Sequence, residues 1–352
     1  MKRYVPTGKT AFGGIGSVVV CKDKNLDRKV VIKSVQEGVE HRRLLDELAA
    51  LQRIRSKHVV QIFDADFFGP RNEMGIVEEF IEGEGLETLL GTVSSGEDFL
   101  RLLYQASAGI ADIHDVGIVH RDIKPSNMLV SQEGILKIID FNLSRNEDEA
   151  NTFDFVGTRG YAAPEQYSGG RVTFTTAVDV YALGVTAWAL LHGEDLPKEL
   201  RSEPPQPDVW KERSEGFLSL QLDPELAQLL NDCVSSLPTD RPAAAQVRDR
   251  AARLILKDRH RALVLGTAQP FELHAGNRLV RVSHTLGNLT IEYDGLDFRA
   301  TSVSGEVWVN NMRMEAGVVI SGCRVIALGS PTRRASQRIF LTMDVSHPEV
   351  VL

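Results

Sequence analysis

The chain has 352 residues, of which 43% are apolar, and this is enough to bury one large core or two smaller ones, so two domains are expected. Its formal net charge of -8 gives no basic footprint for a nucleic acid backbone. Cys21, Cys233 and Cys323 are odd in number and far apart, which argues against a disulfide framework or a closely spaced zinc motif and predicts reduced core thiols. Since no window reaches 18 apolar residues, no membrane span is expected, and the predicted location is cytoplasmic.

The first part of the chain predicts a β-rich lobe. The β-branched runs VVVCKD and KVVIKSV are separated by the turn-like KNLDR, as in a hairpin. In EHRRLLDELAALQRI, apolar residues recur at spacings of three and four, which predicts an amphipathic helix over residues 40–54.

The middle of the chain predicts helices. GEDFLRLLYQASAGIADIHDVG carries an apolar stripe ending at Gly117, and VDVYALGVTAWALLHG is apolar all round, as in a buried helix. The Pro-rich EPPQPDVW predicts a loop. DPELAQLLNDCV, with Asp223 as N-cap and Pro224 in the first turn, and RPAAAQVRDRAARLILK predict further helices that end near Lys257.

Beyond residue 258 the pattern changes to short alternating strands. These are LVRVS, NLTIEY, DFRATSV, EVWVNN, RVIAL and RIFLTMDV, with Gly and Asn between them. Regular short strands with turn signals are typical of a β-sandwich, so a second domain is expected over residues 260–352.

A Gly-rich turn and a lysine indicate a phosphate site in the first lobe. AFGGIGSVVV places Gly13, Gly14 and Gly16 between two strands, where backbone N–H groups could approach phosphates. Alone, such a turn is more often only a turn. In VVIK, Lys33 ends an apolar strand and needs a partner, which Glu47 of the following helix could supply, although such a pair is more often a surface pair.

The segment IVHRDIKPSNMLV is more specific. Asp122 could accept a proton from an attacking hydroxyl, Lys124 could neutralise a transferring phosphoryl group, and Asn127 could coordinate Mg²⁺. Asp140, after the strand LKIID, would be the second metal ligand. The alternative, that these groups only cap a loop, is much less favoured once they are taken together.

In this order the motifs resemble those of the protein kinase superfamily, of the eukaryotic-like Ser/Thr type found also in bacteria. The resemblance covers roughly residues 4–257 and implies an α+β, bilobal fold with a β-rich N-lobe over about residues 4–81 and a helical C-lobe over about residues 82–257. It implies ATP and Mg²⁺ as cofactors and a protein Ser or Thr as acceptor.

The resemblance also implies residue roles. Lys33 would hold the α and β phosphates and pair with Glu47, Asp122 would be the catalytic base, and Asp140 the main Mg²⁺ ligand beside Asn127. Val18, Val31 and Leu129 would sandwich the adenine, and the hinge EEFIEG would offer the Glu79 carbonyl and the Ile81 N–H. The nucleotide site implied in full is Ala11, Phe12, Gly13, Gly14, Gly16, Val18, Val31, Lys33, Glu79, Ile81 and Leu129.

The segment GTRGYAAPEQY extends the resemblance. It implies that Thr158 bonds to Asp122 and Lys124, and that Glu165 pairs with Arg241 of PTDRP.

Three further positions have implied roles. Asp179 matches a buried helix Asp that braces the catalytic loop. Arg121 precedes the catalytic Asp, which usually accompanies activation by a loop phosphate, and Thr152 is the expected site of autophosphorylation.

The chain departs from the family pattern at three positions. Ala11 stands where the family prefers Gly, and Glu78 stands before the hinge, where it usually has an apolar or Thr side chain. A buried unpaired carboxylate would be costly, so either Glu78 finds a cation or the alignment slips by one. Asn142 replaces the Gly after Phe141, but Asn tolerates left-handed backbone, so an active enzyme is expected. The alternative is a pseudokinase that binds nucleotide with little transfer.

The tail resembles the end of a forkhead-associated domain, where VN opens a tight turn. Cys323 replaces the usual Asp in SGCRVIALG, and Ser283 directly precedes His284, so the Ser-x-x-His motif that reads phosphothreonine is not found. The expectation is a forkhead-associated-like sandwich without phosphate binding, about as favoured as another small β domain. It could dock a partner or its own kinase lobe.

Overall fold

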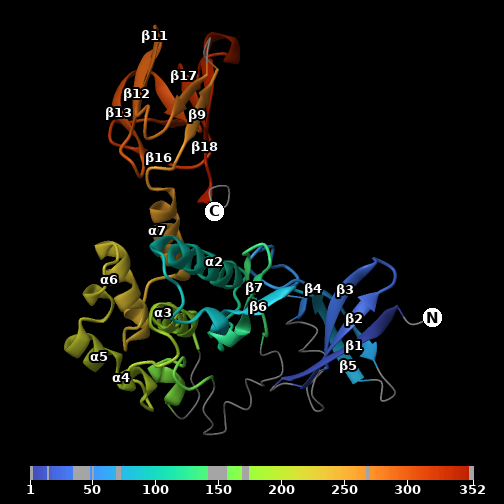
Figure 1. Ribbon diagram of the computed structural model, residues 1–352. Helices are drawn as coiled ribbons and strands as arrows, with labels where there is room; N and C mark the ends of the chain where they lie inside the picture. Colours follow the sequence, from blue (N-terminus) through green and yellow to red (C-terminus); the bar gives the residue numbers. More distant parts are fainter. Residues whose placement is uncertain are drawn as a thin grey trace. The chain divides into compact units, whose positions relative to one another are not determined.

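The computed structural model describes residues 3–13, 16–34, 48–49, 51–68, 73–141, 157–168, 174–266 and 270–348. The chain divides into two compact units, Met1–Asp249 and Arg250–Leu352 (Figure 1). Each unit is considered by itself below.

The first unit begins with a five-stranded antiparallel sheet in the order β1-β2-β3-β5-β4. The predicted hairpin is β2 and β3, in which Val20 lies opposite Val31. The strand bounds are β1 (Tyr4–Gly13), β2 (Gly16–Asp23), β3 (Arg28–Ser34), β4 (Ile62–Phe68) and β5 (Glu73–Glu79).

The two faces of this sheet have different roles. One face packs a small apolar cluster that includes Val30, Ile32 and Val77. Because side chains alternate along a strand, Val31 and Lys33 lie on the opposite face. The helix predicted over residues 40–54 falls mostly outside the described residues.

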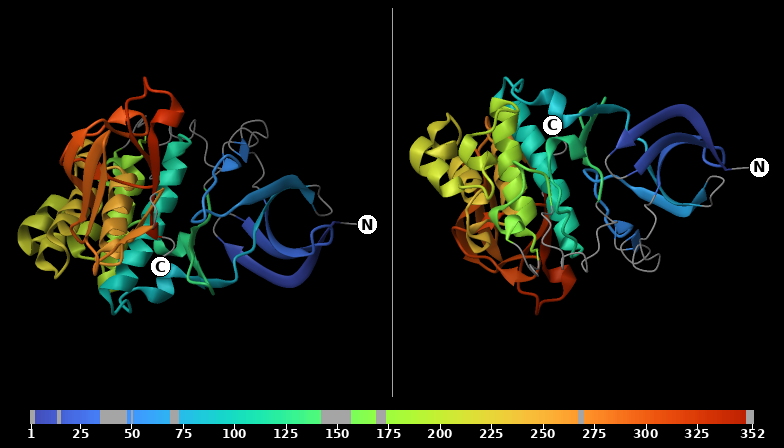
Figure 2. Two further views of the ribbon diagram at one scale, coloured as in Figure 1. Left: turned by 90° about the horizontal axis from the view of Figure 1, so that it is seen from above. Right: turned by 90° about the horizontal axis from the view of Figure 1, so that it is seen from below.

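A three-stranded sheet, β6-β7-β8, connects this lobe to the helices. Both views of Figure 2 show the five-stranded sheet on one side and the helices of the first unit on the other. The bounds are β6 (Gly83–Gly85), β7 (Met128–Ser131) and β8 (Leu136–Ile138), with the short helices η1 (Leu86–Leu89) and η2 (Pro125–Asn127) beside them.

The helical lobe is built around α3 (Ala177–His192), which is buried on nearly every side, as its all-round apolar sequence predicts. The predicted start of α6 is confirmed, because the Asp223 carboxylate accepts a hydrogen bond of 3.1 Å from the Leu226 N–H and Pro224 lies in the first turn. The other helices are α2 (Gly96–Asp115), η4 (Pro164–Tyr167), α4 (Lys198–Arg201), η5 (Gly216–Ser219), α6 (Pro224–Cys233), η6 (Pro238–Asp240) and α7 (Ala244–Leu256).

The loop predicted for EPPQPDVW is wrong in its second half, since α5 (Pro207–Ser214) begins inside it. Pro207 occupies the first turn, where its missing N–H costs nothing. Trp210 is only 3% exposed and meets Trp188 edge-on, with ring centroids 4.8 Å apart. Burial of this aromatic ring stabilises the helix.

No helix in the described part of the chain combines the length and apolar character needed to cross a membrane.

The second unit contains two antiparallel sheets around one core, as the alternating pattern predicts. The orders are β10-β9-β18-β17-β14-β15 and β11-β12-β13-β16. The strands that the sequence had not predicted are β9 (Ala262–Leu265), β10 (Phe271–Leu273), β15 (Met312–Arg313) and β16 (Val319–Ile320). The predicted ones are β11 (Leu279–His284), β12 (Gly287–Tyr293), β13 (Phe298–Gly305), β14 (Val307–Val309), β17 (Arg324–Leu328) and β18 (Ile339–Val345), with η7 (Ala335–Gln337) before the last.

The tight turn expected at VN is present between β14 and β15. Asn310 and Asn311 have φ angles of 47° and 66°, as a two-residue hairpin turn requires. The Asn310 side-chain oxygen accepts a 3.1 Å hydrogen bond from the Val325 N–H, which ties the turn to β17.

The three cysteines do not share one environment. Cys21 and Cys233 are buried, as predicted, but Cys323 is exposed, so the prediction of a core thiol is wrong there. Its Sγ donates a 2.7 Å hydrogen bond to Asp344 Oδ1. The flanking Gly322 has a positive φ of 65°, and the side chain of Cys323 lies in this exposed turn outside the core.

A Glu306 and Arg333 pair in the second unit gives a pH-dependent prediction. Arg333 donates to both Glu306 oxygens, at 2.7 and 2.9 Å, and holds the pKa of Glu306 down at about 2. Because this pKa lies below the usual 4.5, the pair contributes stability above about pH 4.5 that is lost as the pH falls towards 2. Melting of Glu306→Gln and the parent chain should show a small difference in Tm at pH 7 that shrinks in acid. A difference that stays constant with pH would contradict this assignment.

Candidate active site

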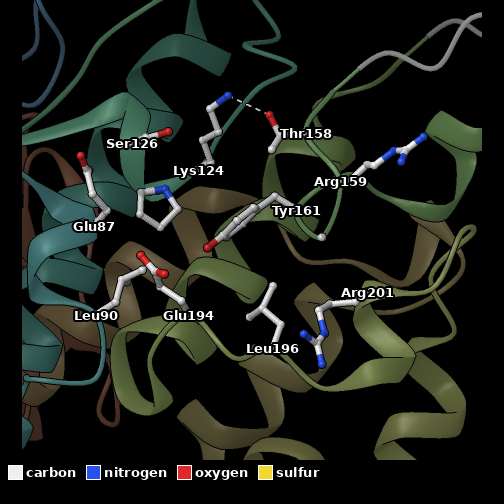
Figure 3. A pocket seen from close by; sticks show the side chains of 12 residues that line it. Glu87, Leu90, Lys124, Ser126, Thr158, Arg159, Tyr161, Glu194, Leu196 and Arg201 are labelled. Carbon is white, nitrogen blue, oxygen red and sulfur yellow. Dashed lines mark hydrogen bonds between the residues drawn. The ribbon is translucent and has the colours of Figure 1, made fainter.

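Asp122, Lys124 and Thr158 form a closed triangle of hydrogen bonds. Lys124 Nζ donates to Asp122 Oδ2 at 2.9 Å. It also donates to Thr158 Oγ1 at 2.8 Å, as Figure 3 shows. Thr158 Oγ1 in turn donates to Asp122 Oδ1 at 2.7 Å. The contacts predicted for Thr158 are therefore confirmed, although 36 residues separate it from Asp122.

The triangle keeps Asp122 ionised. Burial by itself raises the pKa of this carboxyl, but the hydrogen bonds from Lys124 and Thr158 outweigh burial, and the net pKa lies below the usual 3.8. At neutral pH the group is therefore a carboxylate that can accept a proton.

Asp179 fixes the backbone that carries the triangle. Its carboxylate accepts 2.8 Å hydrogen bonds from the N–H groups of His120 and Arg121, and one of its oxygens lies 2.9 Å from His114 Nε2. Asp179 is 1% exposed, and Arg121 has a φ of 68°, a left-handed backbone that needs support of this kind. The bracing predicted for Asp179 is confirmed.

Asn127 and Asp140 supply oxygen atoms that remain available. Asn127 Nδ2 donates to the Asp122 backbone oxygen at 2.8 Å, and among the described residues no donor reaches its Oδ1. The Ile139 N–H bonds to the Asn127 backbone oxygen at 2.9 Å, which brings the next residue, Asp140, alongside. Asp140 has a φ of 67° and uses only Oδ1 in an ion pair with a described residue. One amide oxygen and one carboxylate oxygen suit Mg²⁺, which takes its other ligands from phosphates and water.

Phe141, the residue after Asp140, packs against His120. Their ring centroids lie 4.9 Å apart. His120 Nε2 lies 3.1 Å from the Ile139 backbone oxygen. Asn142 and Thr152 fall outside the described residues.

On the site face of the five-stranded sheet, Lys33 meets two carboxylates. Its Nζ lies 2.9 Å from Glu78 Oε2 and 3.3 Å from Asp140 Oδ1. Glu78 is 5% exposed, so the buried carboxylate has found its cation. Glu47 lies outside the described residues, and its pairing with Lys33 stays a prediction.

Strand pairing places two of the residues predicted to hold adenine. Val18 lies opposite Lys33 on the neighbouring strand, and Leu129 pairs with Gly85 just beyond the hinge. The Ile81 N–H has no hydrogen-bond partner among the described residues and remains available to a ligand. Of the Gly-rich loop, Ala11, Phe12, Gly13 and Gly16 have a described backbone in β1 and β2, whereas Gly14 does not.

Arg241 and Glu165 form the predicted pair. Arg241 Nη1 and Nη2 donate to the two Glu165 oxygens at 2.7 and 2.8 Å, and the Arg241 side chain is fully buried. Further hydrogen bonds from Arg241 reach the backbone oxygens of Ala177 and Ser235 at 3.0 and 2.8 Å. The pair joins the segment after Thr158 to α3 and the chain before η6.

A pocket of about 480 Å³ opens beside Lys124 and Thr158 (Figure 3). Tyr161 lies in its wall, and burial, together with the nearby Glu194 carboxylate, raises the pKa of its hydroxyl to about 12. Sequence reasoning missed this wall, because its residues come from separate segments without a shared pattern. Those residues are Glu87, Leu90, Tyr161, Glu194, Leu196 and Arg201.

Comparisons with known proteins agree with this geometry. The family model described as a protein kinase domain matches residues 4–251. "Serine/threonine-protein kinases drp72" of Corynebacterium efficiens is 37% identical over 195 residues, which cover 51% of this chain and 37% of the relative. "Probable serine/threonine-protein kinase pknA2" of Bifidobacterium longum is 31% identical over 279 residues, covering 72% of this chain and 36% of the relative.

The similarity extends to eukaryotic proteins. "Cyclin-dependent kinase-like 2" of Homo sapiens is 32% identical over 206 residues, which cover 56% of this chain and 41% of the relative. The chain therefore matches well under half the length of each of these three relatives. Because the family model spans most of the chain and its matched region contains the triangle, the lysine and the candidate metal ligands, the chain belongs to the protein kinase family.

Proposed function

We propose that the chain is an ATP-dependent Ser/Thr protein kinase. The observation that carries the proposal is the triangle of Asp122, Lys124 and Thr158, next to the available oxygens of Asn127 and Asp140. The names of two bacterial relatives support the same assignment, and the name of the human relative supports a kinase. The resemblance supports Ser/Thr acceptors, because in this family a Lys two residues after the catalytic Asp, here Lys124 after Asp122, accompanies Ser/Thr rather than Tyr acceptors.

Each side chain would have one task in the transfer. Asp122 would take the proton of the attacking hydroxyl while the new bond from that oxygen to the γ-phosphorus forms and the bond to the β-γ bridging oxygen breaks, leaving ADP. Lys124, bonded to Asp122, would stabilise negative charge on the transferring group. Asn127 and Asp140 would hold Mg²⁺, which when bound neutralises phosphate charge.

Two alternatives have their own expectations. A pseudokinase would bind Mg·ATP without transfer, and a small-molecule kinase would prefer low-molecular-weight acceptors. The buried Glu165 and Arg241 pair supports a protein acceptor, because it holds the APE segment that follows Thr158 and Tyr161 of the pocket wall.

The test is incubation of the full chain with γ-labelled Mg·ATP and either a generic basic protein or a panel of small-molecule acceptors. Label on the protein is the expected result, and tight nucleotide binding with no transfer to any acceptor would favour the pseudokinase. Mass spectrometry of the same reaction should find the proposed autophosphorylation at Thr152. Finding that peptide unmodified would count against Thr152.

We also propose that residues 260–352 form a forkhead-associated-like docking domain that does not read phosphothreonine. The two-sheet core and the Asn310 and Asn311 turn support the likeness. The adjacent Ser283 and His284 support the loss of phosphate binding.

A further inference from the structure

We propose that Glu78 is a positioning residue that holds the Lys33 ammonium in the nucleotide cleft. Lys33 is thus positioned from within its own sheet, in addition to any contribution from Glu47. The proposal rests on the kinase function proposed above and names a role for a residue that the family pattern leaves apolar or Thr.

The register of the sheet determines the contact. Val31 of β3 lies opposite Glu78 of β5, and Lys33 lies opposite Ile76. Directly opposite residues share a face of a sheet, so Glu78 and Lys33 are diagonal neighbours on the site face, within reach of long side chains. Their Nζ and Oε2 atoms are 2.9 Å apart. Because β3 and β5 are hydrogen-bonded strands, the contact does not depend on the position of any helix.

Because Glu78 is buried, loss of its ion pair with Lys33 would cost free energy. Its side chain is 6% exposed, and among the described residues Lys33 is its sole ion-pair partner. Burial raises the pKa of Glu78, and the Lys33 ammonium opposes that rise. Since removing one partner of a buried ion pair leaves an uncompensated charge, Glu78 strongly favours conformations in which Lys33 stays in the cleft.

Lys33 remains charged and keeps a donor for a ligand. Two carboxylate oxygens, of Glu78 and Asp140, lie 2.9 and 3.3 Å from its Nζ, and opposite charges this close favour the ammonium form. An ammonium has three N–H donors. Glu78 and Asp140 use two of them, and the third can bond to a phosphate oxygen of ATP.

The test compares Glu78→Gln, Glu47→Gln and a matched control in the full chain. Asp27→Asn is the control, because it removes a carboxylate from a Lys22 ion pair in the turn between β2 and β3, where the Asp27 side chain is 92% exposed. We expect Glu78→Gln to raise KM for ATP by at least about tenfold, more than Glu47→Gln does, and Asp27→Asn to stay within about twofold of the parent. Glu78→Asp, which keeps the charge, should recover part of the loss.

A second readout tests the site without requiring activity. Equilibrium titration of the full chain with ATP in the presence of Mg²⁺ measures the dissociation constant of the nucleotide, Kd. We expect Glu78→Gln to raise Kd by at least about tenfold, because the Lys33 ammonium is no longer held where it can bond to a phosphate oxygen. Asp27→Asn should leave Kd within about twofold of the parent.

The possible results distinguish the positioning role of Glu78 from the kinase function of the chain. If Glu78→Gln leaves both KM and Kd for ATP within about twofold of the parent, Glu78 does not position Lys33. If Glu78→Gln fails to fold, as judged by its melting curve, Glu78→Met removes the buried charge and is measured in the same way. If the parent chain transfers no phosphate, the kinase function fails, while Kd for ATP still decides the role of Glu78.

Discussion

Asp122→Asn is expected to lower the rate of phosphoryl transfer by about 10²- to 10⁴-fold, the range typical of a lost general base. The amide keeps the shape of the side chain but can no longer take the proton of the acceptor hydroxyl. Since Asp122 bonds to Lys124 and Thr158 on the acceptor side of the site, the affinity for Mg·ATP should change little. Steady-state kcat and a separate nucleotide-binding titration measure the two quantities.

The control for this variant is Glu133→Gln, which changes an exposed carboxylate in the turn between β7 and β8. It should keep full activity. A loss of less than about threefold in Asp122→Asn would mean that the acceptor hydroxyl needs no base at this position.

Arg241→Met is expected to destabilise the first unit by about 3–5 kcal/mol, because it leaves the Glu165 carboxylate partly buried without its cation. The variant also removes donors from the backbone oxygens of Ala177 and Ser235. For a unit of this size, such a loss corresponds to a fall in Tm of about 6–20 °C. Thermal melting of the full chain measures it.

A surface pair provides the matched comparison. Arg201 lies 3.1 Å from Asp195, and their side chains are 54% and 89% exposed. Because exposed pairs are worth little, Arg201→Met should change stability by less than about 1 kcal/mol. Equal effects of Arg201→Met and Arg241→Met would contradict the structural role assigned to the buried pair.

The periodic parts of the fold could be predicted from the sequence. The stripe of α2, the apolar surface of α3 and the capped start of α6 all express local rules that need no tertiary information. The start of α5 could not be predicted, because Pro-rich composition indicates a loop while burial of Trp210 against Trp188 favours the helix. The shortest strands, such as β15 with two residues, carry no periodic signal of their own.

The site was predictable where a motif is local. Asp122, Lys124 and Asn127 lie within six residues, whereas the contact of Thr158 with them followed from the family resemblance. The partner of Lys33 was predicted as Glu47, and Glu78 was left open between a slipped alignment and an unidentified cation. Strand register decides that question, and register follows from pairing across the whole sheet.

Of the departures from the family pattern, Glu78 is explained by the structure, whereas Asn142 lies outside the described residues. Glu78 has a cation, Lys33, and shares a face of the sheet with it, so the alignment at the hinge needs no shift. Tolerance of Asn142 stays a prediction from the left-handed preference of Asn. The oxygens of Asn127 and Asp140 fit a metal, so the pseudokinase alternative gains no support from the described residues.

The most direct test of the proposed kinase function is phosphoamino acid analysis of an acceptor protein after incubation with the full chain and γ-labelled Mg·ATP. We expect label on Ser or Thr that depends on Mg²⁺ and falls by at least about 100-fold in Asp122→Asn. Absence of labelled protein from a chain that binds Mg·ATP, or equal labelling by the parent and Asp122→Asn, would contradict it.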